Sequence, residues 1–190
     1  MHLVNSALIF AAKKHDGQFR KKEGVPYITH PVEVMSIVSR LTSDENALAA
    51  AVLHDTVEDT DTTLEEIEEL FGKEVRELVA HETEDKRRDK PAKDTWKIRK
   101  VESLAALKAA ENPFVSYIWL GDKLSNMRSL NEIFDKKGDA CFDSFNMKDK
   151  SQQAWYYHSI CDILENTLSD KPEFVEFKQL VTKIFGEKAV

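Results

Sequence analysis

The amino-acid sequence predicts an all-α protein that forms one domain over residues 1–190, a helical bundle with C-terminal helices packed on it. Apolar residues recur nearly throughout at the three- and four-residue spacing of helices. No segment shows the alternating pattern of a β-strand, and the sequence has no internal repeat or low-complexity segment. A chain of this length can bury the core of one domain. We expect the C-terminal helical extension over about residues 140–190.

The first predicted elements are three helices and a loop. One buried face predicts the first helix and comprises Leu3, Ala7, Phe10 and Ala11. Residues 17–27 contain two glycines, a proline and a charge run, and they predict a loop. Pro31 suits the first position of a second helix, which places His30 at the start of that helix. Thr42, with Glu45 three residues later, predicts the N-terminal cap of a third helix, which is apolar on every side.

The rest of the chain predicts further helices. Thr62 and Glu65 form a second capping box, and the helix that it opens is expected to end at Gly72. The charged segment 84–94 contains a proline and predicts an exposed connection. The remaining helices are expected around Val75–Val79, from Thr95 to about Ala110, over FVSYIWLGDKLSNMRSLNEIF, around Ile160–Leu168 and from Pro172 to Ile184.

Charge, cysteine content and hydropathy limit the classes of function. A net charge of -7 argues against a protein that coats nucleic acid. Cys141 and Cys161 form no metal-binding pair, which favours a reducing, cytoplasmic location. No run approaches the roughly 20 apolar residues that cross a bilayer, and the N-terminus lacks the pattern of a signal peptide. We therefore expect neither a nucleic-acid partner nor a membrane.

The dipeptide His54-Asp55 is the first candidate for chemistry. It lies on a helix that is otherwise apolar, where buried polar groups need compensation, for example by a metal ion. Glu58 and Asp59 follow four residues later and share one side of the helix if it continues that far. The alternative is that these two acids mark a solvated helix end.

Asp122 is a second, independent candidate. It takes a place where leucine is usual, on the apolar face formed by Val115, Ile118 and Trp119. Either hydrogen bonds in the core satisfy this carboxylate or it binds a cation. Imidazole and carboxylate ligands suit Mn²⁺, Fe²⁺ or Zn²⁺ and predict metal-assisted hydrolysis of a phosphate ester or anhydride. The remaining histidines are interpreted as surface or core residues: His2, His15, His81 and His158.

Five motifs in fixed order over residues 7–131 carry a family resemblance: HDGQFRK, PYITHP, AAVLHDTVEDT, TLEEIEELFGKEVRELV and GDKLSNMRSL. With them the chain resembles the HD superfamily, in particular the hydrolase domain of RelA/SpoT-type proteins and the small alarmone hydrolases. The resemblance implies one divalent metal ion, usually Mn²⁺, bound by His30, His54, Asp55 and Asp122. It implies that Glu58 and Asp59 activate or orient the attacking water. It also implies substrate contacts by Arg20, Lys21, Tyr27, Asn126 and Arg128.

The reaction implied is removal of the 3′-pyrophosphate from guanosine tetra- or pentaphosphate (ppGpp or pppGpp). The sequence is too short to include the synthetase domain of long RelA/SpoT proteins as well, so we expect the chain to degrade the alarmone and not to make it. The segment KEGVP differs from the loop common in long RelA/SpoT proteins, so another nucleotide is an alternative substrate. The candidates are an adenosine alarmone, a nucleoside triphosphate and a nucleoside monophosphate. A third reading is a non-catalytic nucleotide sensor, against which the acids Glu58 and Asp59 count. The helical surfaces could also form a homodimer.

Overall fold

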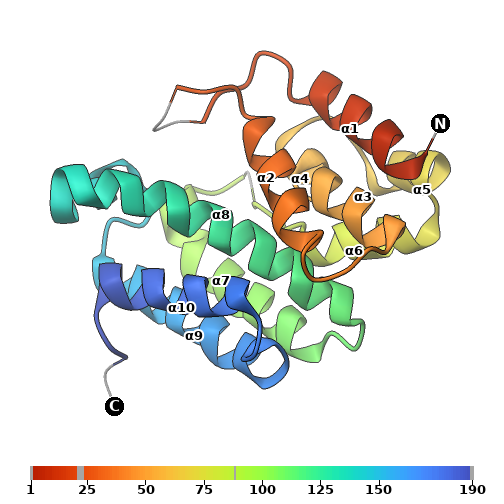
Figure 1. Cartoon of the computed structure of the whole chain (residues 1–190). Coiled ribbons are helices and arrows are strands. Elements are labelled where there is room, and N and C mark those ends of the chain that lie inside the picture. The colour runs from red at the N-terminus through yellow and green to blue at the C-terminus, as the bar shows by residue number, and fades with distance from the viewer. Residues whose placement is uncertain (1, 21–23, 88, 189–190) are drawn as a thin grey trace. The chain divides into compact units, whose positions relative to one another are not determined.

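The computed structural model describes residues 2–20, 24–87 and 89–188, and these residues form helices joined by short segments, without a strand. The elements in chain order are α1 (Leu3–Lys14), α2 (Thr29–Val38), α3 (Glu45–Leu53), α4 (Thr56–Asp59), α5 (Leu64–Phe71), α6 (Lys73–Glu82), α7 (Ala92–Ala109), α8 (Pro113–Lys137), the 3-10 helix η1 (Gly138–Ser144), α9 (Lys150–Leu168) and α10 (Pro172–Phe185) (Figure 1). The all-α prediction is confirmed for the described residues. None of their helices combines the length and the apolar character needed to span a membrane.

The chain divides into two compact units. The first comprises Met1–Asp85 with Ala110–Asp122, and the second comprises Lys86–Ala109 with Lys123–Val190. Within the first unit α3 packs against α1, α2 and α6, while α5 packs against α6 (Figure 1). Within the second unit α9 packs against α7 and α10. The assignment of residues 1–190 to one domain stays a prediction.

Helix α3 is central to the first unit because its side chains are small and apolar. Ala47, Ala49, Ala50 and Ala51 are fully buried, so the neighbouring helices approach its backbone closely. The predicted cap at Thr42 is wrong: the cap is Asp44, whose carboxylate accepts hydrogen bonds from the backbone N–H groups of Asn46 and Ala47, both 2.9 Å. Both residue types cap helices, and here the residue adjacent to the helix does so.

Two further helix starts also differ from the prediction. The cap of α5 is Thr63 rather than Thr62, and its hydroxyl accepts a hydrogen bond from the backbone N–H of Glu66. Helix α2 begins at Thr29, two residues before Pro31, which lies in the first turn, where a missing N–H costs nothing. The predicted end at Gly72 is confirmed, and its φ of 90° explains the choice of glycine.

Gly121 lies where α8 meets α2. A Cβ atom at this position would be 3.0 Å from Val38 Cγ2, 3.1 Å from Val34 Cγ1 and 3.2 Å from the Val34 carbonyl oxygen. Only a residue without a side chain therefore allows this close approach of the two helices. The next residue on α8 is Asp122, and α2 carries His30 one turn before Val34, so the close contact brings these two side chains together.

Candidate metal centre

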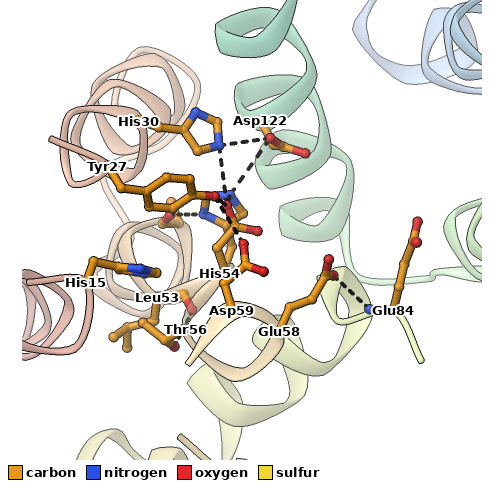
Figure 2. Close-up of polar contacts among 12 residues, drawn as sticks. His15, Tyr27, His30, Leu53, His54, Thr56, Glu58, Asp59, Glu84 and Asp122 are labelled. Atoms are coloured by element: carbon orange, nitrogen blue, oxygen red, sulfur yellow. Dashed lines mark hydrogen bonds and ion pairs between the residues drawn. The ribbon is translucent and has the colours of Figure 1, made fainter. Parts of the chain in front are cut away.

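A buried cluster of two histidines and an aspartate lies in the first unit. His30 comes from the first turn of α2, His54 follows the last residue of α3, and Asp122 comes from α8 (Figure 2). All three are buried, and each offers one ligand atom within 4.8 Å of the others. Asp122 Oδ1 lies 3.1 Å from His30 Nε2 and 3.8 Å from His54 Nε2. Ligands that lie roughly 2.0–2.2 Å from a metal ion have mutual distances of this order.

The hydrogen bonding of His54 leaves one of its ring nitrogens facing the carboxylates beside it. Its Nδ1 lies 2.8 Å from the carbonyl oxygen of Ala51, which can only accept, so Nδ1 carries the proton. Nε2 is buried and faces two carboxylates, with Asp55 Oδ2 3.0 Å away and Asp122 Oδ1 3.8 Å away. Burial alone would lower the pKa of His54, but the negative charge of Asp55, followed by that of Asp122, raises it to about 10. Carboxylates that favour a proton on this ring also favour a divalent cation, so the donor set fits a metal ion.

Asp55 points toward the same cluster because the helix is interrupted at this position. Helix α3 ends at Leu53 and α4 begins at Thr56, so the condition for a shared helix side, one helix continuing from His54 to Asp59, is not met. Asp55 makes no side-chain cap to α4; its Oδ2 lies 3.0 Å from His54 Nε2 and 3.5 Å from His30 Nε2. Burial alone would raise the pKa of Asp55, but His54 and His30 hold this pKa well below its usual value.

Tyr27 is connected to the buried cluster of His30, His54 and Asp122 through Asp55. Its hydroxyl donates a hydrogen bond of 2.5 Å to Asp55 Oδ2 and lies 3.4 Å from Asp59 Oδ2 (Figure 2). Its ring contacts the imidazoles of His15 and His30, with centroids 4.9 Å and 5.9 Å away. Burial, followed by the charges of Asp55 and Asp59, raises the pKa of Tyr27 well above the usual tyrosine value, so the hydroxyl remains a donor.

The two predicted catalytic acids on α4 point in different directions. The Glu58 side chain extends toward Glu84, and its Oε2 accepts a hydrogen bond of 3.1 Å from the Glu84 backbone N–H (Figure 2). The Asp59 carboxylate instead lies on the side of Tyr27. The structure therefore brings Asp59 to the Tyr27 hydroxyl, which also contacts Asp55, while Glu58 is anchored to the segment that follows α6. Their roles in catalysis stay predictions.

The predicted substrate residues are dispersed along the chain. Arg20 lies in the loop before α2, and its backbone is hydrogen-bonded across this loop. Lys21 lies outside the described residues. Asn126 and Arg128 belong to the second unit, where the Arg128 guanidinium donates hydrogen bonds of 2.7 Å and 2.6 Å to Glu176. Contacts of these four residues with a nucleotide stay predictions.

His15 and Gln18 also connect to this site, although the sequence interpretation gave neither a role. His15 is buried, and its Nδ1 lies 2.9 Å from Gln18 Oε1. The Gln18 amide nitrogen donates a hydrogen bond of 3.1 Å to the carbonyl oxygen of Asp59. This bond orients the amide, so its oxygen faces His15 and accepts from Nδ1. The motif HDGQFRK was the available signal, because it contains both residues at a spacing of three.

Comparisons with known proteins identify the family of this chain. A family model described as the HD domain matches residues 7–143. The human protein named guanosine-3′,5′-bis(diphosphate) 3′-pyrophosphohydrolase MESH1 is 43% identical over 125 residues, which cover 64% of this chain and 66% of that protein. The protein named GTP pyrophosphokinase rsh of Brucella suis biovar 1 is 38% identical over 135 residues, 71% of this chain.

Solved structures share the fold as well as part of the sequence. A protein described as a metazoan orthologue of SpoT that hydrolyses ppGpp matches with a TM-score of 0.79 and 27% identity, over 98% of both chains. A protein from Listeria monocytogenes EGD-e matches with a TM-score of 0.72 and 32% identity, over 85% of this chain and 97% of that one. The chain spans only 18% of the length of the Brucella relative. The resemblance inferred from the sequence motifs is thereby confirmed.

Proposed function

Because the chain belongs to the HD-domain family, we propose that it is a metal-dependent hydrolase that removes the 3′-pyrophosphate of guanosine 3′,5′-bis(diphosphate), ppGpp. The observation that carries this proposal is the buried cluster of His30, His54 and Asp122, in which the buried Nε2 of His54 is directed at carboxylate oxygens. The name of the human relative, which is 43% identical, supports the choice of substrate. A guanosine tetraphosphate is therefore the first substrate to test.

The metal ion in this proposal is Mn²⁺, held by His30, His54, Asp55 and Asp122. A set of two imidazoles and two carboxylates suits a borderline or hard divalent cation. When bound, such an ion supplies Lewis-acid polarisation of a phosphoryl oxygen and makes water a better nucleophile. The hydrogen bond from His54 Nδ1 to the Ala51 carbonyl supports this assignment, since it orients the ring and leaves Nε2 for the ion.

The chain's own residues would handle the proton and the nucleotide. Asp59, whose carboxylate lies beside Tyr27, would accept the proton of the attacking water, and Glu58 would orient that water. Arg20 carries a planar guanidinium that can both stack on a purine and bind phosphate, and Lys21 would add a second cation. Asn126 and Arg128 complete the substrate contacts that we propose from the family resemblance. A cytoplasmic location and a homodimer stay predictions.

The first experiment measures hydrolysis of ppGpp by the full chain with Mn²⁺. Parallel reactions contain GTP, the adenosine counterpart of ppGpp, and AMP. Release of pyrophosphate from ppGpp alone is the expected result. Preference for one of the others would change the proposed substrate but not the proposed hydrolase activity. The segment KEGVP, which differs from the loop of long RelA/SpoT proteins, is the reason to test for this outcome. Mn²⁺ binding without turnover of any of the four nucleotides would favour a nucleotide sensor instead.

The catalytic acids are tested separately from the ligands. Glu58→Gln and Asp59→Asn should each leave Mn²⁺ bound and lower kcat by roughly 10²- to 10⁴-fold, the usual contribution of general acid–base catalysis. Asp61→Asn is the matched control, because Asp61 is an exposed acid that pairs with Lys14. Unchanged turnover in one of the first two variants would reject the role of that acid.

A further inference from the structure

The hydroxyl of Tyr27 donates a hydrogen bond to Asp55, a predicted metal ligand. It does so at the carboxylate oxygen of Asp55 that also faces the imidazoles of His30 and His54. Tyr27 donates to Asp55 Oδ2 at 2.5 Å, and this oxygen lies 3.0 Å from His54 Nε2 and 3.5 Å from His30 Nε2. A hydrogen bond to an ionised carboxylate is shorter and roughly twice as strong as one between neutral groups. The bond therefore restricts the rotation of the carboxylate while its oxygen remains directed at the cluster.

The tyrosine ring is itself held from several sides. It meets the ring of His30 at an interplanar angle of 68°, and its other neighbour is the buried ring of His15. The backbone N–H of Tyr27 donates to the Gln18 carbonyl oxygen at 2.9 Å, and the Gln18 side chain donates to the Asp59 carbonyl oxygen at 3.1 Å. These contacts fix the loop before α2 to α4, so the hydroxyl has a defined position relative to Asp55.

We propose that Tyr27 is a positioning residue, which holds the Asp55 carboxylate in the orientation that binds the metal ion. This inference deepens the proposed function and rests on its metal site. It differs from the role that the family resemblance implied, in which Tyr27 contacts the nucleotide. The two roles predict different measurements, since a residue that orients a ligand changes metal affinity, whereas a residue that contacts substrate changes KM.

The test is Tyr27→Phe, which removes the hydroxyl and keeps the ring between the two histidines. Mn²⁺ is titrated into the chelator-treated full chain without nucleotide, and free Mn²⁺ is followed by electron paramagnetic resonance. Loss of a hydrogen bond to a metal ligand typically costs 10- to 100-fold in affinity, so we expect the Kd to rise by roughly that factor. We also expect kcat to recover when Mn²⁺ is raised above the new Kd. Tyr117→Phe, at a half-buried tyrosine whose ring contacts Phe114, is the matched control.

Two results with the Tyr27→Phe variant would overturn the proposal, and one result with the unaltered chain would overturn it together with the proposed function. An unchanged Kd with a raised KM would return Tyr27 to the substrate site, and an unchanged Kd with unchanged kinetics would leave the ring with a packing role only. Because Mn²⁺ binding is measured without nucleotide, a failure to hydrolyse ppGpp does not obscure the result. Conversely, hydrolysis of ppGpp with an unchanged Kd would reject the role of Tyr27 and leave the proposed function in place. Failure of the unaltered chain to bind Mn²⁺ would overturn both.

Discussion

Gly121→Ala should disturb the metal centre without altering any ligand. The added Cβ would meet Val38 Cγ2 at 3.0 Å and the Val34 carbonyl oxygen at 3.2 Å. The valine side chain has one strongly preferred rotamer on a helix, and the carbonyl belongs to the backbone of α2. Neither can move aside easily, so α8 must shift away from α2. Asp122 moves with α8, while His30 remains on α2.

The size of the effect follows from these contacts. Ordinary carbon–carbon contacts lie at roughly 3.5–4.0 Å, so a Cβ at 3.0 Å requires a shift of about 0.5 Å or more. Overpacking costs about 1–3 kcal/mol, and replacing a helical glycine by alanine returns about 1 kcal/mol. The net loss of stability is therefore only about 0–2 kcal/mol. A displacement of about 0.5 Å is nevertheless at the limit that a metal site tolerates, and we expect the Kd for Mn²⁺ to rise about tenfold or more.

Two measurements decide the matter, namely urea unfolding without metal and Mn²⁺ titration of the folded chain. Ser116→Ala is the control, because it also introduces alanine into α8 but adds no atom to the helix surface. A Gly121→Ala variant that is more stable than the original chain and binds Mn²⁺ equally well would refute the reasoning. That outcome would mean that α2 and α8 separate at no cost and that the position of Asp122 does not depend on their contact.

Three further predictions concern single residues. Asp55→Ala should remove Mn²⁺ binding and hydrolysis together, and retained metal with full turnover would exclude Asp55 as a ligand. Arg20→Ala should raise KM by roughly 10- to 100-fold, the cost of a hydrogen bond to a charged group, and a change in kcat alone would contradict this role. Burial raises the pKa of Cys161 to about 12, so its alkylation at pH 8, followed by mass spectrometry, should be about a thousand-fold slower in the native chain than in urea. Rapid native labelling would contradict that expectation.

Burial of the key polar residues could be predicted from the sequence because helical periodicity reports it directly. Asp122 is only 6% exposed, as expected for a position on the face of Ile118 and Trp119, which are themselves buried. His54 is 1% exposed, as its apolar surroundings in the sequence indicated. A single polar residue on an otherwise apolar face therefore carries reliable information about burial, even without knowledge of its partners.

Other features could not be predicted, because they depend on partners distant in sequence or on a choice between similar residues. The role of Gly121 is set by α2, more than eighty residues earlier in the chain. The contact from Tyr27 to Asp55 likewise joins two separate motifs. The caps moved by one or two residues because Thr42 and Asp44 are both good capping residues, and the pattern of apolar residues does not distinguish them.

The break between α3 and α4 explains how two adjacent residues can serve one ion. Successive side chains on a continuous helix point about 100° apart, so neighbouring residues would not converge on one point. In the turn that the structure contains, His54 Nε2 and Asp55 Oδ2 lie 3.0 Å apart. The Thr56 hydroxyl closes the end of α3 by donating a 2.6 Å hydrogen bond to the Leu53 carbonyl oxygen. The turn at His54 and Asp55 therefore lets the side chains of two adjacent residues face the same point.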